Sequence, residues 1–221
     1  MQVVFLFLLF AVATLAGTRG WDLSVFQGDV SESSFKCLYN QGYRFGIIQS
    51  QRSNGLKNPY APNVYRRAHA AGFKFLDFYI FPHKGTDGRV QARNQVKWLL
   101  SEGVLTKNML WIDIEAKNLF HPTHQQNIQM VKDMISEIDL HYKGCGRSSC
   151  VGIYASKVQW DAIMGSSCTS FAKYDLWWPH YDNRPTFDGF NAFGGWHMPQ
   201  IKQFTGTTNI CSTQIDNNYY P

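Results

Sequence analysis

The sequence lacks the short motifs that usually bind zinc, although metal-binding side chains are present. Its 221 residues include five cysteines and seven histidines, but no Cys-x-x-Cys and no His-x-x-x-His. Structural and catalytic zinc sites draw on such closely spaced pairs. We therefore expect no metal site.

Long basic runs are also missing. Of the 21 lysines and arginines, only Arg66 and Arg67 are adjacent, and the formal net charge is +5. Nucleic-acid-binding proteins usually carry a concentrated basic stripe, so we expect no nucleic-acid partner. A modest positive charge suits an anionic polymer, but it is equally ordinary for a soluble protein. Charge alone therefore does not identify a partner.

Only one long apolar run occurs, and it stands at the extreme N-terminus. Val3–Ala16 is nearly all apolar and is followed by small, helix-breaking residues up to Gly20. Such a run is too short to span a bilayer and is typical of a secretory signal peptide, although the usual basic residues before it are missing. We expect residues 1–20 to be the signal peptide, with a mature start near Trp21, and cleavage after Ala16 as the alternative. The protein is then secreted, or delivered to a lysosomal or phagosomal compartment.

The cysteines all follow this segment. In an exported protein they are expected to form disulfides, and two bridges plus one leftover thiol is the simplest arrangement of five. Cys145 and Cys150 flank a small Gly/Ser loop and could pair locally, whereas the remaining connectivity cannot be read from the sequence. The full set is Cys37, Cys145, Cys150, Cys168 and Cys211.

The most informative stretch is Met109–Ala116, which is apolar and β-branched apart from Asp113 and Glu115. In a strand, a period of two places both carboxylates on one face and Ile112 and Ile114 on the other. In a helix the two acids would point roughly 200° apart and could not cooperate. Two carboxylates that end a buried strand are costly unless they have a use. The pattern favours a hydrolase acid pair over a helix cap plus one surface acid.

Strand-like and helix-like patterns alternate along residues 21–221, which is typical of an α/β fold with a parallel sheet. The absence of linkers and repeats indicates one domain. Eight strands with only about five helices predict a single (β/α) barrel whose helical ring is incomplete. The expected strands are 21–26, 45–50, 74–81, 109–116, 151–156, 175–181, 200–204 and 214–219, and the expected helices are 31–41, 61–71, 90–102, 123–143 and 158–164.

In such barrels the reactive groups stand at the C-terminal ends of the strands. This rule selects Asp113 and Glu115, together with Asp22 at the end of the first strand and Asp216 at the end of the last. Taken singly, Asp22 could be a helix cap and Asp216 a turn residue. As a set of four they are candidates for acid chemistry.

Six ordered motifs then point to one family. The sequence resembles glycoside hydrolase family 25, the Chalaropsis-type lysozymes, and is most similar to their amoeba and nematode branch. The resemblance covers essentially all of the chain after the signal segment. The motifs are Trp-Asp-Leu-Ser at 21–24, Trp-Ile-Asp-Ile-Glu at 111–115, Gly-Ile-Tyr-Ala-Ser at 152–156, Leu-Trp-Trp-Pro-His-Tyr-Asp at 176–182, Lys-Gln-Phe at 202–204 and Ile-Asp-Asn-Asn at 215–218.

The resemblance implies a flattened, incomplete α/β barrel that cleaves the β-1,4 bond between N-acetylmuramic acid and N-acetylglucosamine in bacterial peptidoglycan, for defence or digestion. It implies no metal or cofactor, and we expect a monomer. Glu115 matches the general acid, and Asp113, Asp22 and Asp216 match its acidic partners. The chain departs from many members at Ile80, where they have His, and at Pro179, where they have Ala. Cleft-lining positions are matched by Tyr79, Tyr154, Trp177, Tyr181 and Gln203.

The family retains the anomeric configuration, and two routes are open. An Asp attacks the sugar directly, or the substrate's own 2-acetamido oxygen attacks while Asp113 orients the amide; the position of Asp113 beside Glu115 favours the second. A chitinase-type enzyme would need a further Asp at Trp111. A wall-binding protein without catalysis would be expected to lose an acid, and a secreted immune-modulating protein with weak activity is the remaining alternative.

Overall fold

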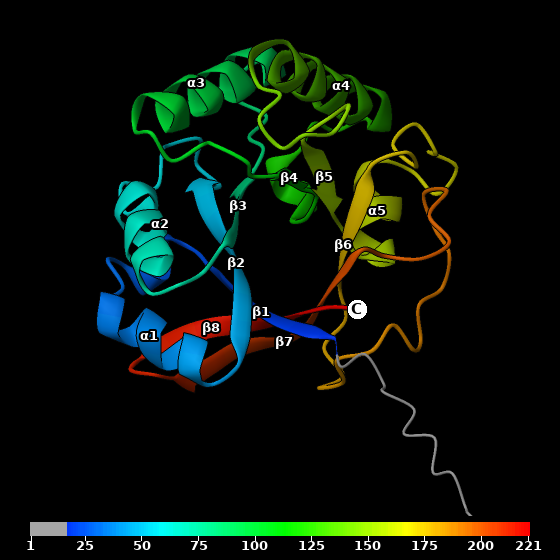
Figure 1. Ribbon diagram of the computed structural model, residues 1–221. Helices are drawn as coiled ribbons and strands as arrows, with labels where there is room; N and C mark the ends of the chain where they lie inside the picture. Colours follow the sequence, from blue (N-terminus) through cyan, green and yellow to red (C-terminus); the bar gives the residue numbers. More distant parts are fainter. Residues whose placement is uncertain (1–16) are drawn as a thin grey trace, which may run out of the picture.

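A computed structural model describes residues 17–221, so residues 1–16 of the expected signal peptide lie outside the described residues. Eight strands form a closed barrel, and Figure 1 looks along its axis with the helices arranged outside it. The strands are β1 (Thr18–Leu23), β2 (Tyr43–Gln51), β3 (Phe75–Ile80), β4 (Leu110–Asp113), β5 (Val151–Tyr154), β6 (Asp175–Pro179), β7 (Ile201–Ile210) and β8 (Thr213–Tyr220). The helices are α1 (Glu32–Asn40), α2 (Ala61–Ala70), α3 (Gly88–Ser101), α4 (His124–His141) and α5 (Lys157–Ile163).

The expected eight strands and five helices are confirmed, and so is the incomplete helical ring, because no α-helix follows β6 or β7 within residues 17–221. The expectation of an all-parallel sheet is wrong for one strand. β8 runs antiparallel to both of its neighbours, β7 and β1. Only Cys211 and Ser212 separate β7 from β8, and both have positive φ. So short a connection permits only a hairpin, since parallel strands need a long crossover.

The ends of several elements differ from the expectation. β1 begins at Thr18, so residues 18–20, which we assigned to the signal peptide, pair with β8 in the described chain. The cleavage position stays a prediction. Val25–Gln27 form a short 3₁₀ turn, not strand, because the Ser24 side chain caps it together with Gln27. β4 ends at Asp113, although the alternation of apolar and acidic residues continues for two more residues, to Glu115.

Local signals explain most helix boundaries. The N-cap side chains Ser31, Asp87, Thr123 and Ser156 accept hydrogen bonds from backbone N–H groups of the helices that follow them. Such caps satisfy donors that the first turn leaves free. The chain leaves α3 through Gly103 with φ of 69°, a conformation that glycine adopts at little cost.

The core has two layers, as expected for alternating side chains on barrel strands. One cluster fills the space between the strands and the helices. The second fills the barrel interior and forms a floor beneath the four acids. Its members are Phe45, Ile47, Tyr79, Trp111, Tyr154, Trp177 and Ile201.

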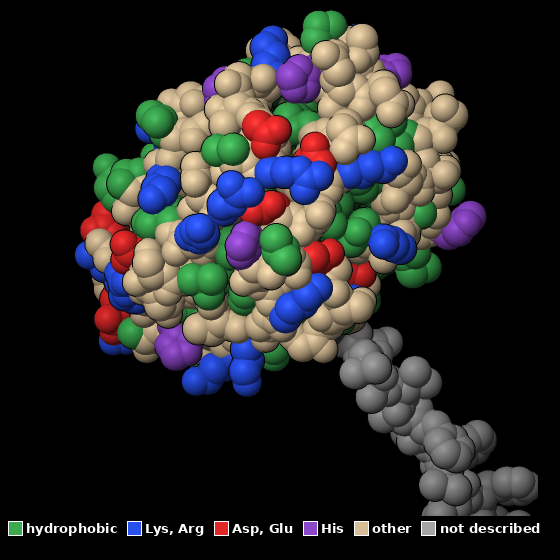
Figure 2. All heavy atoms as spheres, turned by 90° about the horizontal axis from the view of Figure 1, so that it is seen from above, with side chains coloured by type: hydrophobic (Ala, Val, Ile, Leu, Met, Phe, Trp, Pro, Cys, Tyr) green, Lys and Arg blue, Asp and Glu red, His purple; other side chains and the backbone are tan. Residues whose placement is uncertain are grey.

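The helices α3 and α4 pack side by side and cover one flank of the barrel. Figure 2 looks onto this layer and shows basic and acidic side chains lying next to one another. Arg89 pairs with Asp133, and Arg93 pairs with Glu137. The charges of this flank therefore largely cancel.

Two disulfides join Cys37 to Cys211 and Cys145 to Cys150, and Cys168 is a buried free thiol. The expected two bridges, leftover thiol and local Cys145–Cys150 pair are confirmed. Among residues 17–221, no helix combines the length and apolarity needed to cross a membrane.

Candidate active site

The acid pair of β4 lies on the inner face of the barrel. Asp113 and Glu115 both border one cavity, whereas Ile112 and Ile114 are buried in the outer cluster. The strand-like alternation therefore continues past the last residue of β4, supported by a hydrogen bond from the backbone N–H of Ile114 to the carbonyl oxygen of Tyr154. The chain then turns away from the barrel at Ala116, which has φ of 56°. The period of two predicted this arrangement correctly.

Two further acids come from strands that are far apart in sequence. Asp22 in β1 is the register partner of Asp216 in β8. Asp216 is not at the end of its strand, as we expected, but is its fourth residue. Because β8 is antiparallel, its first half reaches the edge of the barrel where the parallel strands end. The strand-end rule thus identified the residue, although the strand direction behind it was wrong.

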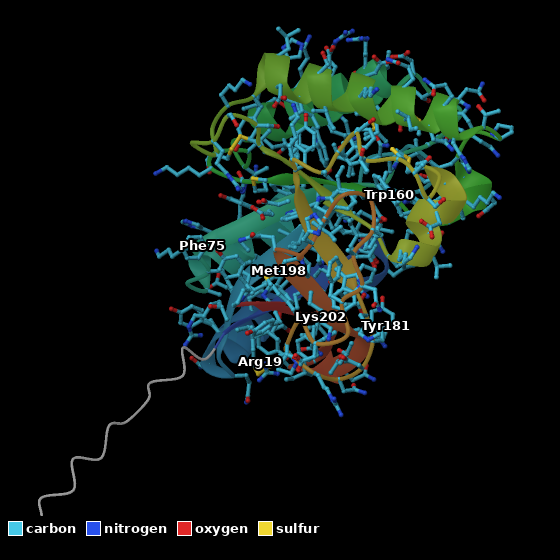
Figure 3. The ribbon with its side chains drawn as sticks, turned by 90° about the vertical axis from the view of Figure 1, so that its right-hand side faces the viewer. Arg19, Phe75, Trp160, Tyr181, Met198 and Lys202 are labelled. Atoms are coloured by element: carbon cyan, nitrogen blue, oxygen red, sulfur yellow. A yellow bond between two sulfur atoms is a disulfide. The ribbon has the colours of Figure 1, made fainter. Side chains whose placement is uncertain are left out.

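All nine residues that the sequence predicted for the site surround a single cavity of about 110 Å³. Tyr181 stands at the outer edge of this end of the barrel, as the side view in Figure 3 shows. Ile80 lies in the outer cluster instead, so its departure from the family places no side chain in the cavity. The lining residues are Asp22, Tyr79, Asp113, Glu115, Tyr154, Trp177, Tyr181, Gln203 and Asp216.

Gln203 is the hub of the polar contacts. Its Nε2 donates to Asp22 Oδ2 at 2.8 Å and, more weakly, to Asp216 Oδ2 at 3.4 Å. Its Oε1 accepts from the hydroxyls of Tyr154 and Tyr181, both at 2.8 Å. The two phenols fix which way the amide points, so that its N–H groups face the carboxylates. This arrangement holds two acids in place from one neutral side chain.

Asn218 is a site residue that the sequence reasoning missed. Its Nδ2 donates to Asp22 Oδ2 at 2.7 Å, and its Oδ1 accepts from Trp177 Nε1 at 2.7 Å. It is fully buried. Its position two residues after Asp216 in a strand is the signal that could have placed it on the same face.

Lys202 and Asp182 form an ion pair outside the cavity, next to Gln203 and Tyr181 in sequence. The Lys202 side chain is fully buried, and its Nζ donates to both carboxylate oxygens of Asp182 at 2.8 Å. Lys202 is the second residue of β7, and Figure 3 labels it beside Tyr181. The pair ties β7, which carries Gln203, to the loop that carries Tyr181.

Burial raises the pKa of every acid in the cavity, and repulsion from other carboxylates adds to it at Asp22, Asp113 and Glu115. Burial is the main cause at Asp113 and Asp22, whose pKa values lie well above the usual range, and nearby carboxylates add to it. Burial and the charge of Asp216 raise the pKa of Glu115, and burial raises that of Asp216 to about 6. Removing water from a carboxylate disfavours its charged form, and like charges add to the effect. The site therefore retains protons in mildly acidic solution.

A buried carboxylate oxygen of the cavity has no hydrogen-bond partner among residues 17–221. Asp113 Oδ1 is buried and accepts no hydrogen bond from the described residues. A buried acceptor in this state is costly unless a ligand supplies a donor. Within residues 17–221, no group of three or more His, Cys, Asp or Glu has an arrangement that could hold a metal ion.

Comparisons with known proteins agree with this geometry. A family model described as "Lysozyme-like protein 1" matches residues 20–204. The chain is 32% identical to "Probable GH family 25 lysozyme 2" of Dictyostelium discoideum over 85% of each protein, and 35% identical to "Lysozyme-like protein 5" of Caenorhabditis elegans over 97% of this chain and 96% of that one. The fold is that of a family GH25 lysozyme from Aspergillus fumigatus, with a TM-score of 0.73 at 21% identity over 93% of this chain and 94% of the other.

Proposed function

Because the chain belongs to the glycoside hydrolase family 25 lysozymes, and to their amoeba and nematode group, we propose that it hydrolyses the β-1,4 bond between N-acetylmuramic acid and N-acetylglucosamine in bacterial peptidoglycan. The observation that carries the proposal is the cavity in which four carboxyl groups converge. Glycoside hydrolysis needs a proton donor and a group that stabilises the oxocarbenium-like transition state. All four positions that the family uses are occupied by acids.

Glu115 is the proton donor in this proposal. Its raised pKa keeps it protonated in mildly acidic solution, which is the state a general acid requires. It gives its proton to the glycosidic oxygen as the bond from that oxygen to the anomeric carbon breaks. It then takes a proton from the water that completes the hydrolysis.

Asp113 orients the substrate's acetamide. Its unpartnered Oδ1 accepts the amide N–H, and in its ionised form the carboxylate balances the positive charge that develops on the amide as the carbonyl oxygen bonds to the anomeric carbon. Water then attacks the same carbon and opens the ring that this bond had closed, so that the configuration is retained after two inversions. Proximity favours this route, because the nucleophile belongs to the bound sugar.

The central test is loss of turbidity of a bacterial wall suspension, measured for the wild type and for Glu115→Gln. The amide is nearly isosteric but cannot act as the acid, and general acid catalysis contributes about 10²–10⁴-fold. We expect a loss of that size with unchanged folding. Glu102→Gln is the matched control, because Glu102 is paired with Arg66 outside the cavity. Near-wild-type lysis by Glu115→Gln would assign the acid elsewhere.

A second test separates the two catalytic routes. Peptidoglycan with de-N-acetylated muramic acid lacks the internal nucleophile, so substrate-assisted catalysis predicts strong resistance. A thiazoline mimic of the cyclised intermediate should inhibit, as transition-state-like ligands do. A direct attack by Asp predicts a loss of only about tenfold on the modified substrate and a trappable glycosyl-enzyme. Mass spectrometry that finds sugar attached to Asp22, Asp113 or Asp216 would overturn the substrate-assisted route.

We further propose that the protein acts outside the cytosol, as a monomer, in defence or in the digestion of bacteria. The apolar N-terminal run and the two disulfides support export. N-terminal sequencing of protein collected from the medium would locate the cleavage site, at Gly20 or at Ala16. Retention of the uncleaved chain in the cytosol would contradict export.

A further inference from the structure

The end of the barrel opposite the acids carries an unusual pattern of positive charge. Each of the six consecutive strands β1–β6 has an exposed lysine or arginine close to its first residue. Figure 3 places Arg19 and Phe75 toward this end and Tyr181 toward the other. Signal cleavage after Gly20 would remove Arg19 and leave the other five. We call the set the basic end; its members are Arg19, Arg44, Lys74, Lys107, Arg147 and Lys173.

Five of the six have no acidic partner. Only Arg147 forms an ion pair, with Asp175, and no other member has a carboxylate within 4 Å among residues 17–221. Arg19 donates to the hydroxyl of Tyr43, and Arg44 donates to a backbone carbonyl oxygen of α1. These contacts fix the side chains without neutralising them.

The nearby acids do not cancel this charge. Glu102 is paired with Arg66, and Asp139 lies 3.7 Å from Lys143. Asp77 is partly exposed and accepts hydrogen bonds from the backbone N–H of Met109 and from Trp111 Nε1, and desolvation raises its pKa to about 6. The five unpaired cations are as many as the whole net charge of +5. The formal charges of the remaining residues therefore sum to zero.

The spacing of the cations suits an extended ligand. Neighbouring strands lie about 4.8 Å apart, so six strand starts span an arc of roughly 24 Å. A small anion would be held by one or two of these side chains. The nearest hollow, of about 190 Å³, is lined by Arg147 and Lys173 but also by Asp139 and Asp175, which disfavours a free phosphate there.

We infer that the basic end binds an anionic phosphodiester polymer of the bacterial wall, of the polyol-phosphate type, while the cavity at the other end cleaves the glycan. The inference rests on the proposed function, because such a polymer is present where peptidoglycan is the substrate. A polyanion releases counterions when it binds a row of cations, which gives attraction without deep pockets. A lipid surface is less well matched, since the exposed apolar side chains Phe75, Leu140 and Met198 come from three separate elements, β3, the end of α4 and the segment before β7, and Phe75 and Met198 belong to opposite sides of the barrel.

The geometry has a functional consequence. The polymer would hold the enzyme by the end that carries no catalytic group. The cavity would remain free to face successive glycan strands of the same wall. Attachment and cleavage would then be separate properties, which charge substitutions could alter independently.

The test compares two triple variants with the same change of net charge. Lys74, Lys107 and Lys173 are replaced by Gln at the basic end, and Lys36, Lys97 and Lys132 are replaced by Gln on the outer faces of the helices as the matched control. All six side chains are exposed, so both variants should fold. Binding to soluble polyglycerol phosphate is measured by fluorescence polarisation over a series of salt concentrations. Lysis of walls stripped of phosphodiester polymer is measured in parallel.

We expect the basic-end variant to bind the polymer roughly 100-fold more weakly, at about tenfold or less per charge near an anionic surface, and to show a shallower salt dependence. The control should bind within a few-fold of the wild type. Both variants should lyse stripped walls like the wild type.

Equal losses of binding in the two variants would show a non-specific charge effect and overturn the inference. So would selective loss of binding to vesicles of phosphatidylcholine and phosphatidylserine when polymer binding is unchanged, which would assign the face to a membrane. If the wild type lyses no walls but binds the polymer through the basic end, the proposed catalytic function is wrong, whereas the inference about polymer binding is supported.

Discussion

The two ends of the barrel use charge in opposite ways. At one end, four carboxyl groups share a cavity of about 110 Å³, so burial and repulsion work against their ionised forms. At the other, the unpaired basic side chains are exposed to solvent, where like charges repel only weakly. The catalytic end therefore gives up stability for reactivity, whereas the basic end costs the fold little. Substitutions at the two ends should consequently differ in sign as well as in size.

The largest contrast is expected from an acid-to-amide change at each end. Asp113→Asn should lower wall lysis about 10²–10³-fold, because the amide cannot balance charge on the substrate. It should also raise the melting temperature, since it removes a buried carboxyl with an unpartnered oxygen. Asp175→Asn should leave lysis within about twofold and lower stability by at most about 1 kcal/mol through the loss of the pair with Arg147.

Turbidity assays and thermal unfolding of both variants measure this contrast. A destabilised Asp113→Asn protein would mean that the cavity is not strained by its acids. The comparison of the two ends would then lose its energetic basis.

The two disulfides should differ in how much each contributes to the free energy of unfolding. Cys37–Cys211 ties the β7–β8 hairpin to α1 at a sequence separation of 174, whereas Cys145–Cys150 closes a separation of 5 just before β5. In the chain-entropy view, their removal should cost about 5 and about 2 kcal/mol respectively. Paired Cys→Ser variants, unfolded in urea, give both values. Equal losses would contradict the entropic ordering.

The pH dependence of stability should be smaller but has a definite sign. The folded-state pKa of Asp216, about 6, and the raised pKa values of Asp22, Asp113 and Glu115 all exceed the ordinary values near 4. The folded state therefore holds more protons than the unfolded state between about pH 4 and 6. Stability contributed by these protons is lost as pH rises through the folded pKa values.

We expect the melting temperature to fall by a few degrees between pH 5 and pH 7.5, and the fall to be smaller in Asp216→Asn. Asp77 contributes to the same trend, so some of it should persist in that variant. The basic-end lysine variant should show the wild-type slope, because it leaves the four cavity acids and Asp77 unchanged. A melting temperature that rises with pH across this window would contradict the assigned pKa directions.

The sequence was sufficient for features that depend on local periodicity. The alternation in Met109–Ala116 placed Asp113 and Glu115 on one face, and strand–helix alternation predicted the barrel. The antiparallel direction of β8 escaped prediction because the Gly-, Asn- and Pro-rich C-terminal third contains no helical pattern from which connection lengths can be read. Asn218 was missed because its role depends on a contact with Asp22, at a sequence separation of 196.

The basic end was not predicted from the sequence for a different reason. Along the chain, each strand and the helix or loop after it separate one member from the next, so the cations look scattered in the sequence. Only the topology brings them together, because every parallel strand starts at the same edge. Charge counted along a sequence therefore underestimates charge concentrated on one end of a barrel.

The closure of the barrel by β8 also sets the order in which activity can arise. β1 emerges first from the ribosome, yet Asp216, the register partner of Asp22, belongs to the last strand to be made. Contacts so distant in sequence slow folding, and the edges of β1 and β7 remain open until β8 docks between them. A chain interrupted before β8 would lack both the closing strand and one of the four acids. We therefore expect the growing chain to gain its full set of cavity acids only when β8 closes the barrel.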